Sequence, residues 1–152
     1  MADFALAHAL HVLSVILWIG GVGFVTLVLI PALSGGEPAT RMARFHDLES
    51  RFAPIARWLV GIAGASGLCM VWRMDMWSRF ADAQFWWMHA MVAAWLAFAV
   101  MLYLLEPLVL HRRMASSPDP ARDFALLRRM HQVLLVLSLL AAGGAAAGAH
   151  GF

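Results

Sequence analysis

The stretch HVLSVILWIGGVGFVTLVLIPAL, residues 11–33, contains no acidic residue, no arginine and no lysine. A helix needs roughly 20 apolar residues to cross the hydrocarbon core of a membrane. Four such segments follow one another along the chain, and they lack the alternating polarity of barrel strands. They run over residues 4–33, 55–72, 84–110 and 127–149. The pattern predicts an all-α fold, an integral membrane four-helix bundle in a single domain, residues 1–152.

The composition supports a lipid environment. Of the 152 residues, 62% are hydrophobic and only 13% are charged, and the mean hydropathy is +0.76. A soluble domain of this size cannot bury so much apolar surface. The single cysteine excludes an internal disulfide and a CxxC motif. The eleven basic residues are all arginine and are scattered around apolar segments, so no nucleic-acid partner is expected.

The arginines also predict the orientation. Nine lie after the first and third segments or early in the fourth, whereas the opposite side has only Arg73 and Arg79. Because arginine accumulates in cytoplasmic loops, both termini are expected outside, in the periplasm of a bacterium with the protein in its inner membrane. An outer aromatic belt is then expected at Trp72, Trp77, Trp86 and Trp87.

An additional cytoplasmic interfacial helix is predicted within ATRMARFHDLESRFAP, residues 39–54. Met42, Phe45, Leu48 and Phe52 recur at steps of three and four, which is the spacing of an amphipathic helix. Residues before a proline are biased away from helical geometry, so we expect this helix to end before Pro54.

Two histidines at similar depth suggest a haem site. At about 1.5 Å per residue, His11 lies about two turns inside the outer surface and His89 about one turn. One imidazole from each of two helices can ligate a b-type haem, with His8 as an alternative ligand on the face of His11. Arg73 and Arg79 could pair with the propionates. Hydrogen bonding to a carbonyl or a lipid headgroup remains the alternative, and for His8 and His150 it is favoured.

Two motifs resemble the CopD-like and HemJ-like four-helix membrane families. Their first helix has a histidine, a tryptophan seven residues later, a glycine pair and a later proline, and their third has a tryptophan-any-histidine pattern. The matching residues are His11, Trp18, Gly20, Gly21 and Pro31 in the first segment, and Trp87 and His89 in the third.

The resemblance implies a function for each family. HemJ-like proteins bind b-type haem and oxidise protoporphyrinogen, so His11, His89 and Trp18 would lie at the haem. CopD-like proteins are linked to copper uptake across the inner membrane. The chain departs from the HemJ-like pattern at Met91, where that family has lysine, and at Ala32, where it has arginine. These departures favour haem binding without porphyrinogen oxidation.

A Cu(I) site is a second metal hypothesis. The stretch CMVWRMDMW, residues 69–77, places Cys69, Met70 and Met74 near the outer end of the second segment, and soft sulfur ligands select Cu(I). Methionine is also a common filler of apolar cores. Several glycines, among them Gly64, Gly144 and Gly148, are expected where helices pack closely.

A second polar layer is expected towards the inner face. It comprises Tyr103, Glu106, His111 and His131, with His131 or Arg128 as the expected partner of Glu106. Such a cluster could pass protons to or from a quinone, and a buried ion pair or an acid reaching the interface is the alternative. A second haem between His111 and His131 is a further hypothesis.

The combined prediction is a b-type haem membrane protein that transfers electrons to or from a quinone, a periplasmic partner or a small oxidant. Its alternatives are CopD-like copper uptake, HemJ-like protoporphyrinogen oxidation and an accessory subunit with no cofactor. The outward glycine and tryptophan surfaces suit either a homodimer or contact with the lipid bilayer.

Overall fold

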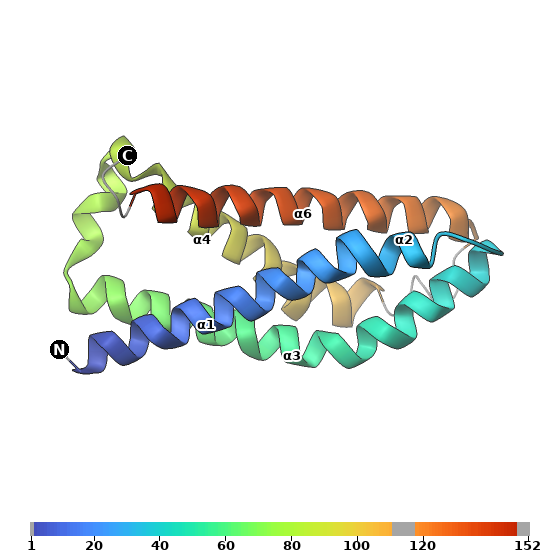
Figure 1. Ribbon diagram of the computed structural model, residues 1–152, viewed down its shortest axis with the longest axis horizontal. Helices are drawn as coiled ribbons and strands as arrows, with labels where there is room; N and C mark the ends of the chain where they lie inside the picture. The colour runs from blue at the N-terminus through green and yellow to red at the C-terminus, as the bar shows by residue number, and fades with distance from the viewer. Residues whose placement is uncertain (1, 111–117, 149–152) are drawn as a thin grey trace.

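The computed structural model describes residues 2–110 and 118–148, and every regular element among them is a helix (Figure 1). Two long helices, α1 and α3, lie side by side, and α4 packs mainly against α6. The elements in chain order are α1 (Ala2–Phe24), η1 (Val25–Leu29), α2 (Ile30–Ala32), α3 (Pro38–Arg73), η2 (Met76–Ala81), η3 (Ala83–Phe85), α4 (Trp86–Ala99), η4 (Val100–Leu110) and α6 (Pro120–Gly148).

Four continuous helical stretches are long and apolar enough to cross a membrane, which confirms the predicted spans and makes the chain a multi-pass membrane protein. They are Asp3–Ala32, Pro38–Arg73, Ala83–Glu106 and Pro120–Gly148. The second and fourth begin well before their apolar segments, because polar turns precede the lipid-facing part of each helix.

The predicted separate interfacial helix is wrong in its end point. Residues 39–54 are helical, but α3 continues through Pro54 to Arg73 as one helix. Met42 and Phe45 are buried against Ile30 rather than facing lipid headgroups. Packing in the bundle therefore outweighs the local preference to end before a proline. α3 bends in Figure 1, and a proline is a usual cause of a bend.

The start of α3 is capped by an exposed glutamate. The Glu37 carboxylate accepts hydrogen bonds from the backbone N–H groups of Ala39 and Thr40, at 3.3 and 3.1 Å, and from the Thr40 hydroxyl at 3.0 Å. These bonds favour the charged form and lower the pKa of Glu37. Pro38 occupies the first turn, where its missing N–H has no consequence.

Aromatic rings lie directly on glycines where the helices meet. A Cβ added to Gly144 would lie 2.5 Å from the Trp86 ring, one added to Gly148 would lie 2.5 Å from Trp87, and Trp95 lies in the same way on Gly64. Gly64, Gly144 and Gly148 therefore mark close packing as predicted, whereas Gly20 has no neighbour within 4 Å. The GxxxG pair of α6, Gly144 and Gly148, holds α4 through two neighbouring indoles.

We expect Gly144→Ala to destabilise the bundle and Gly143→Ala to leave it unchanged or more stable. The new methyl of Gly144→Ala would overlap the Trp86 ring, at a typical overpacking cost of about 1–3 kcal/mol. Gly143 has no neighbour within 4 Å of its added Cβ, so the variant gains only helix propensity. Thermal unfolding of both variants in the same detergent gives the comparison. Equal destabilisation would contradict the packing role of Gly144.

Candidate functional site

A cavity of about 310 Å³ lies inside the bundle between α1, α3, η4 and α6. Its walls are mostly aliphatic and aromatic, and three polar side chains reach it: Glu49, Glu106 and His131. A concave, mostly apolar space with a few convergent polar groups is the usual form of a small-molecule site. This cavity is therefore the candidate functional site.

Two π-helical segments border the cavity. Val25 and Leu29 reach it from η1, and Met101, Leu102 and Glu106 reach it from η4. Wide helical turns of this kind are rare and are found frequently at functional sites. Residues of both π-helical segments therefore form part of the cavity wall, which supports the same assignment.

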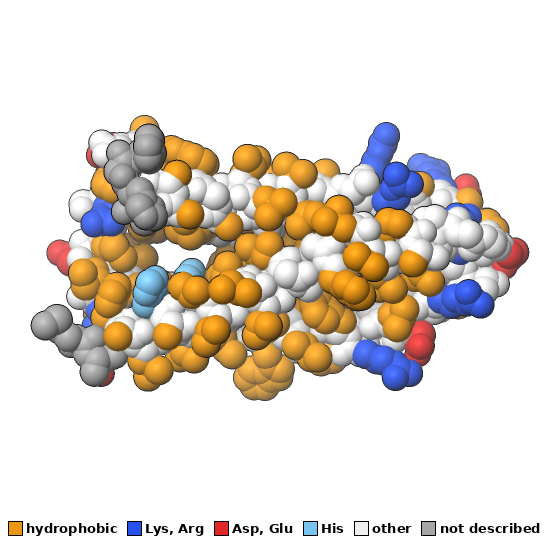
Figure 2. Space-filling view, in the orientation of Figure 1, with side chains coloured by type: hydrophobic (Ala, Val, Ile, Leu, Met, Phe, Trp, Pro, Cys, Tyr) orange, Lys and Arg blue, Asp and Glu red, His pale blue; other side chains and the backbone are white. Residues whose placement is uncertain are grey.

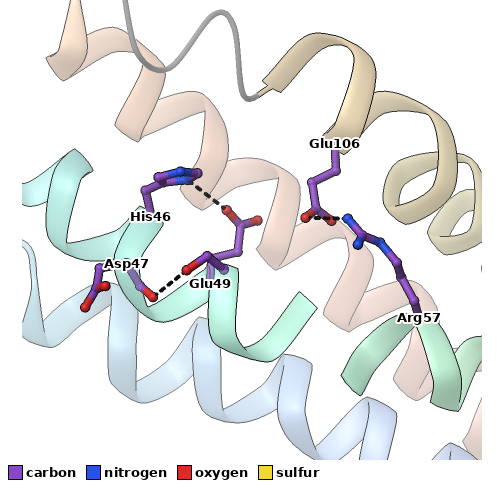
Figure 3. A network of polar contacts seen from close by, with 6 residues as sticks. His46, Asp47, Glu49, Arg57 and Glu106 are labelled. Carbon is purple, nitrogen blue, oxygen red and sulfur yellow. Dashed lines mark hydrogen bonds and ion pairs between the residues drawn. The ribbon is translucent and has the colours of Figure 1, made fainter. Parts of the chain in front are cut away.

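An ion pair fixes one wall of the cavity. An Arg57 guanidinium N–H donates to the Glu106 carboxylate at 2.8 Å (Figure 3). The Nε–H of Arg57 donates to the Leu102 carbonyl at 3.0 Å. The Tyr103 hydroxyl donates to the Arg57 carbonyl at 2.6 Å. The predicted partners of Glu106, His131 and Arg128, are thus replaced by Arg57. Sequence reasoning had placed Arg57 among the loop arginines, because the contact joins two helices far apart in the chain.

Glu49 was also missed by sequence reasoning. Its carboxylate lines the cavity and lies 4.0 Å from Nδ1 of His46, one turn earlier on α3 (Figure 3). From the sequence alone it was assigned no role. Its spacing of eight residues from Arg57 places both on similar faces of one helix, and this was the signal in the sequence.

The other predicted inner residues occupy distinct places. His131 lines the cavity, its Nδ1 lies 3.0 Å from the Leu127 carbonyl, and its ring packs edge-on against Phe45. Glu106 and His131 therefore line the same cavity. Tyr103 is linked to it through its hydrogen bond to Arg57, the partner of Glu106. His111 lies outside the described residues, as does His150.

Trp18 leaves a polar group without a partner at the cavity. The side chain is 4% exposed, lines the cavity and packs edge-on against Phe98 at 4.8 Å between ring centroids. Within the described part of the chain, its indole N–H has no hydrogen-bond acceptor. An unsatisfied buried donor is costly and uncommon.

His11 and His89 hydrogen-bond to different elements of the structure. Nδ1 of His11 lies 2.8 Å from the Ala63 carbonyl on α3, whereas Nε2 of His89 lies 3.0 Å from the Phe80 carbonyl on η2. Leu96 and Val100, on the same side of the third span as His89, are exposed. The two imidazoles thus hydrogen-bond to carbonyls of different elements, and their pairing as haem ligands stays a prediction.

His11 by itself has the orientation of a metal-ligating histidine. When Nδ1–H donates to a backbone carbonyl, the neutral ring carries its proton on Nδ1. Nε2 is then free to bind a metal ion. The added Cβ of Gly67 would lie 3.2 Å from the His11 ring, so the glycine makes room for it. Figure 2 shows a hollow between α1 and α6 with histidine side chains at its edge. Buried residues in this half of the bundle include the small Ser14, Ser66 and Ala141.

The remaining residues predicted for the outer end have separate surroundings. Arg73 pairs with Asp3 at 3.2 Å, Arg79 lies over the Phe85 ring, and His8 stacks on Phe4. Cys69 and Met74 are exposed, and Met70 is half-buried. Among the residues that the structure describes, no three His, Cys, Asp or Glu side chains are grouped to hold a metal ion.

Comparison of the chain with protein-family models, curated proteins and solved structures finds no match in any of the three. The resemblance to the CopD-like and HemJ-like families stays a prediction.

Breaking the Arg57–Glu106 pair should cost far more than breaking a surface pair. Arg57→Met leaves the buried Glu106 charge unbalanced, and we expect it to lower the unfolding free energy by roughly 3 kcal/mol. Glu106→Gln leaves the partly exposed Arg57 guanidinium without its partner and should cost less. The double variant should lose less than the sum. Arg51→Met, which breaks the exposed 3.6 Å pair with Asp47, should cost less than about 1 kcal/mol. Additive losses in a double-mutant cycle would show that the two charges do not interact.

Proposed function

We propose that the protein is a membrane redox component that binds a lipid-soluble molecule of the quinone class in the inner cavity. The observation that carries the proposal is an apolar cavity lined by the Glu49 and Glu106 carboxyl groups and by Trp18, whose buried indole N–H has no acceptor among the described residues. A quinone presents an apolar ring and two carbonyl oxygens, and its reduced form presents two hydroxyls. The apolar walls suit the ring, the Trp18 N–H suits a carbonyl oxygen, and the carboxyl groups suit either the carbonyl or the hydroxyl form.

Each polar residue has a distinct role in this proposal. The Trp18 N–H donates to a carbonyl oxygen of the bound ring, and Glu49 provides a second hydrogen bond at the other side. Arg57 holds Glu106 in place, so Glu106 shapes the wall. Phe98 and the other aromatic walls pack on the ring and exclude water, which strengthens the polar contacts.

The cavity is proposed to lie in the inner half of a bacterial cytoplasmic membrane. The exposed residues Arg44, Arg51, Arg122, Arg128 and Arg129 belong to the ends of α3 and α6 nearest the cavity. Figure 2 shows arginine side chains grouped at that end of the bundle. Under the positive-inside rule this end faces the cytoplasm, and both termini face the periplasm.

Binding of decylubiquinone to the protein in lipid nanodiscs tests the proposal. Trp18→Phe removes one hydrogen-bond donor while keeping an aromatic ring, so we expect Kd to rise roughly fivefold to tenfold. Ala56→Phe places a large ring in the cavity wall and should abolish binding. Ala65→Phe, at an exposed position of the same helix, is the control and should bind normally. Absence of binding by the wild type, or equal binding by Ala56→Phe, would overturn the proposal.

A haem near His11 is a second candidate, favoured by the fixed His11 ring and the hollow beside it. A b-type haem would supply one-electron chemistry, and His11 would hold it. We expect a sharp α band in the reduced-minus-oxidised spectrum that His11→Ala removes. Loss of the band in His89→Ala as well would show that His89 turns inward. A colourless wild type, expressed with ample haem supply, would reject this candidate.

A further inference from the structure

We infer that Glu49 is the proton-exchanging group of the cavity and that His46 links it to the aqueous end of the bundle. This inference rests on the proposed quinone-class ligand and names the residue through which protons would reach it. Neither residue belongs to the inner cluster predicted from the sequence, which comprised Tyr103, Glu106, His111 and His131.

The charges that face Glu49 leave its carboxylate without a full counter-charge. Within the described residues, η4 contributes Glu106, α6 contributes His131, and α3 itself contributes Arg57 and His46. The guanidinium of Arg57 donates to Glu106 at 2.8 Å, so its charge is already directed to that carboxylate. An unbalanced buried charge is costly, and a proton is the simplest charge that can balance the remaining carboxylate.

The exposure and bonding of Glu49 and Glu106 show which of the two carboxylates can exchange a proton. The Glu106 side chain is only 7% exposed and is fixed by Arg57, so exchanging its proton would break an ion pair. The Glu49 side chain is 22% exposed, and the described residues offer it no arginine of its own. Glu49 therefore has access both to the cavity and to the outside, whereas Glu106 faces the cavity alone.

His46 provides the step to water. Its side chain is 38% exposed, and Nδ1 lies 4.0 Å from the Glu49 carboxylate. A small rotation of either side chain, or one bridging water, closes that distance to a hydrogen bond. An imidazole has two ring nitrogens, so a proton that arrives at one can be passed on from the other. A proton can thus pass from solvent to His46, from His46 to Glu49, and from Glu49 to a ligand oxygen.

The inference predicts opposite pH dependences for the two forms of the ligand. Protonated Glu49 donates to a quinone carbonyl, so quinone binding takes up a proton and weakens as pH rises. Ionised Glu49 accepts from a quinol hydroxyl, so quinol binding releases a proton and strengthens as pH rises. Each slope should reach about tenfold in Kd per pH unit where one proton is linked to binding.

Titration calorimetry of decylubiquinone and of decylubiquinol under argon, across a pH series in nanodiscs, measures both slopes. Glu49→Gln should bind both ligands with no pH dependence, because the amide donates and accepts at every pH. Asp47→Asn, two residues earlier and exposed, should keep the wild-type slopes. Slopes that persist in Glu49→Gln, or that vanish in Glu106→Gln instead, would overturn the assignment to Glu49.

A rate measurement tests His46. In stopped flow with a pH-indicating dye, His46→Ala should release the same number of protons on quinol binding but at least about tenfold more slowly. An unchanged rate would remove His46 from the path. Failure of the wild type to bind either ligand would reject the proposed function, whereas binding without any pH dependence would reject only the proton-exchange role of Glu49.

Discussion

A guanidinium inside an apolar bundle has to be held by other groups of the protein, and this requirement at Arg57 organises the inner half of the molecule. Its side chain reaches the Glu106 carboxylate and the Leu102 carbonyl, while its own carbonyl accepts the Tyr103 hydroxyl. All three bonds join α3 to η4. They set the depth and the rotation of one helix relative to the other, because the planar guanidinium makes directional bonds. The cavity lies directly beside this junction.

The cavity owes its space to irregular backbone as much as to side-chain size. The wide turns of η1 and η4 border it, and Thr26 in η1 donates to the Val22 carbonyl at 2.7 Å within its own helix. At Gly21 the absence of a side chain lets the Phe52 ring lie against α1. A regular helix with a larger residue at that position would bring different side chains into the space. Local backbone geometry thus determines which polar groups face the cavity.

The sequence predicted the spans well, because apolar length alone decides them. It placed His11 and His89 at similar depth by counting residues, but depth does not fix which way a side chain points. The third span is apolar on all sides, so its pattern could not show that His89 shares a side with the exposed Leu96. The partner of Glu106 was missed for a related reason. Arg57 and Glu106 meet only through tertiary packing between helices, which local patterns do not encode.

The paired arrangement of the helices also bears on how the chain reaches its final form in the membrane. α1 packs chiefly on α3, and α4 on α6, so each principal partner is the neighbouring span along the chain. The indoles of α4 lie on the glycines of α6, which lets the second pair form without the first. During synthesis two hairpins can therefore insert one after the other and dock afterwards. The cavity walls come from both hairpins, so this site is completed only in that last docking step.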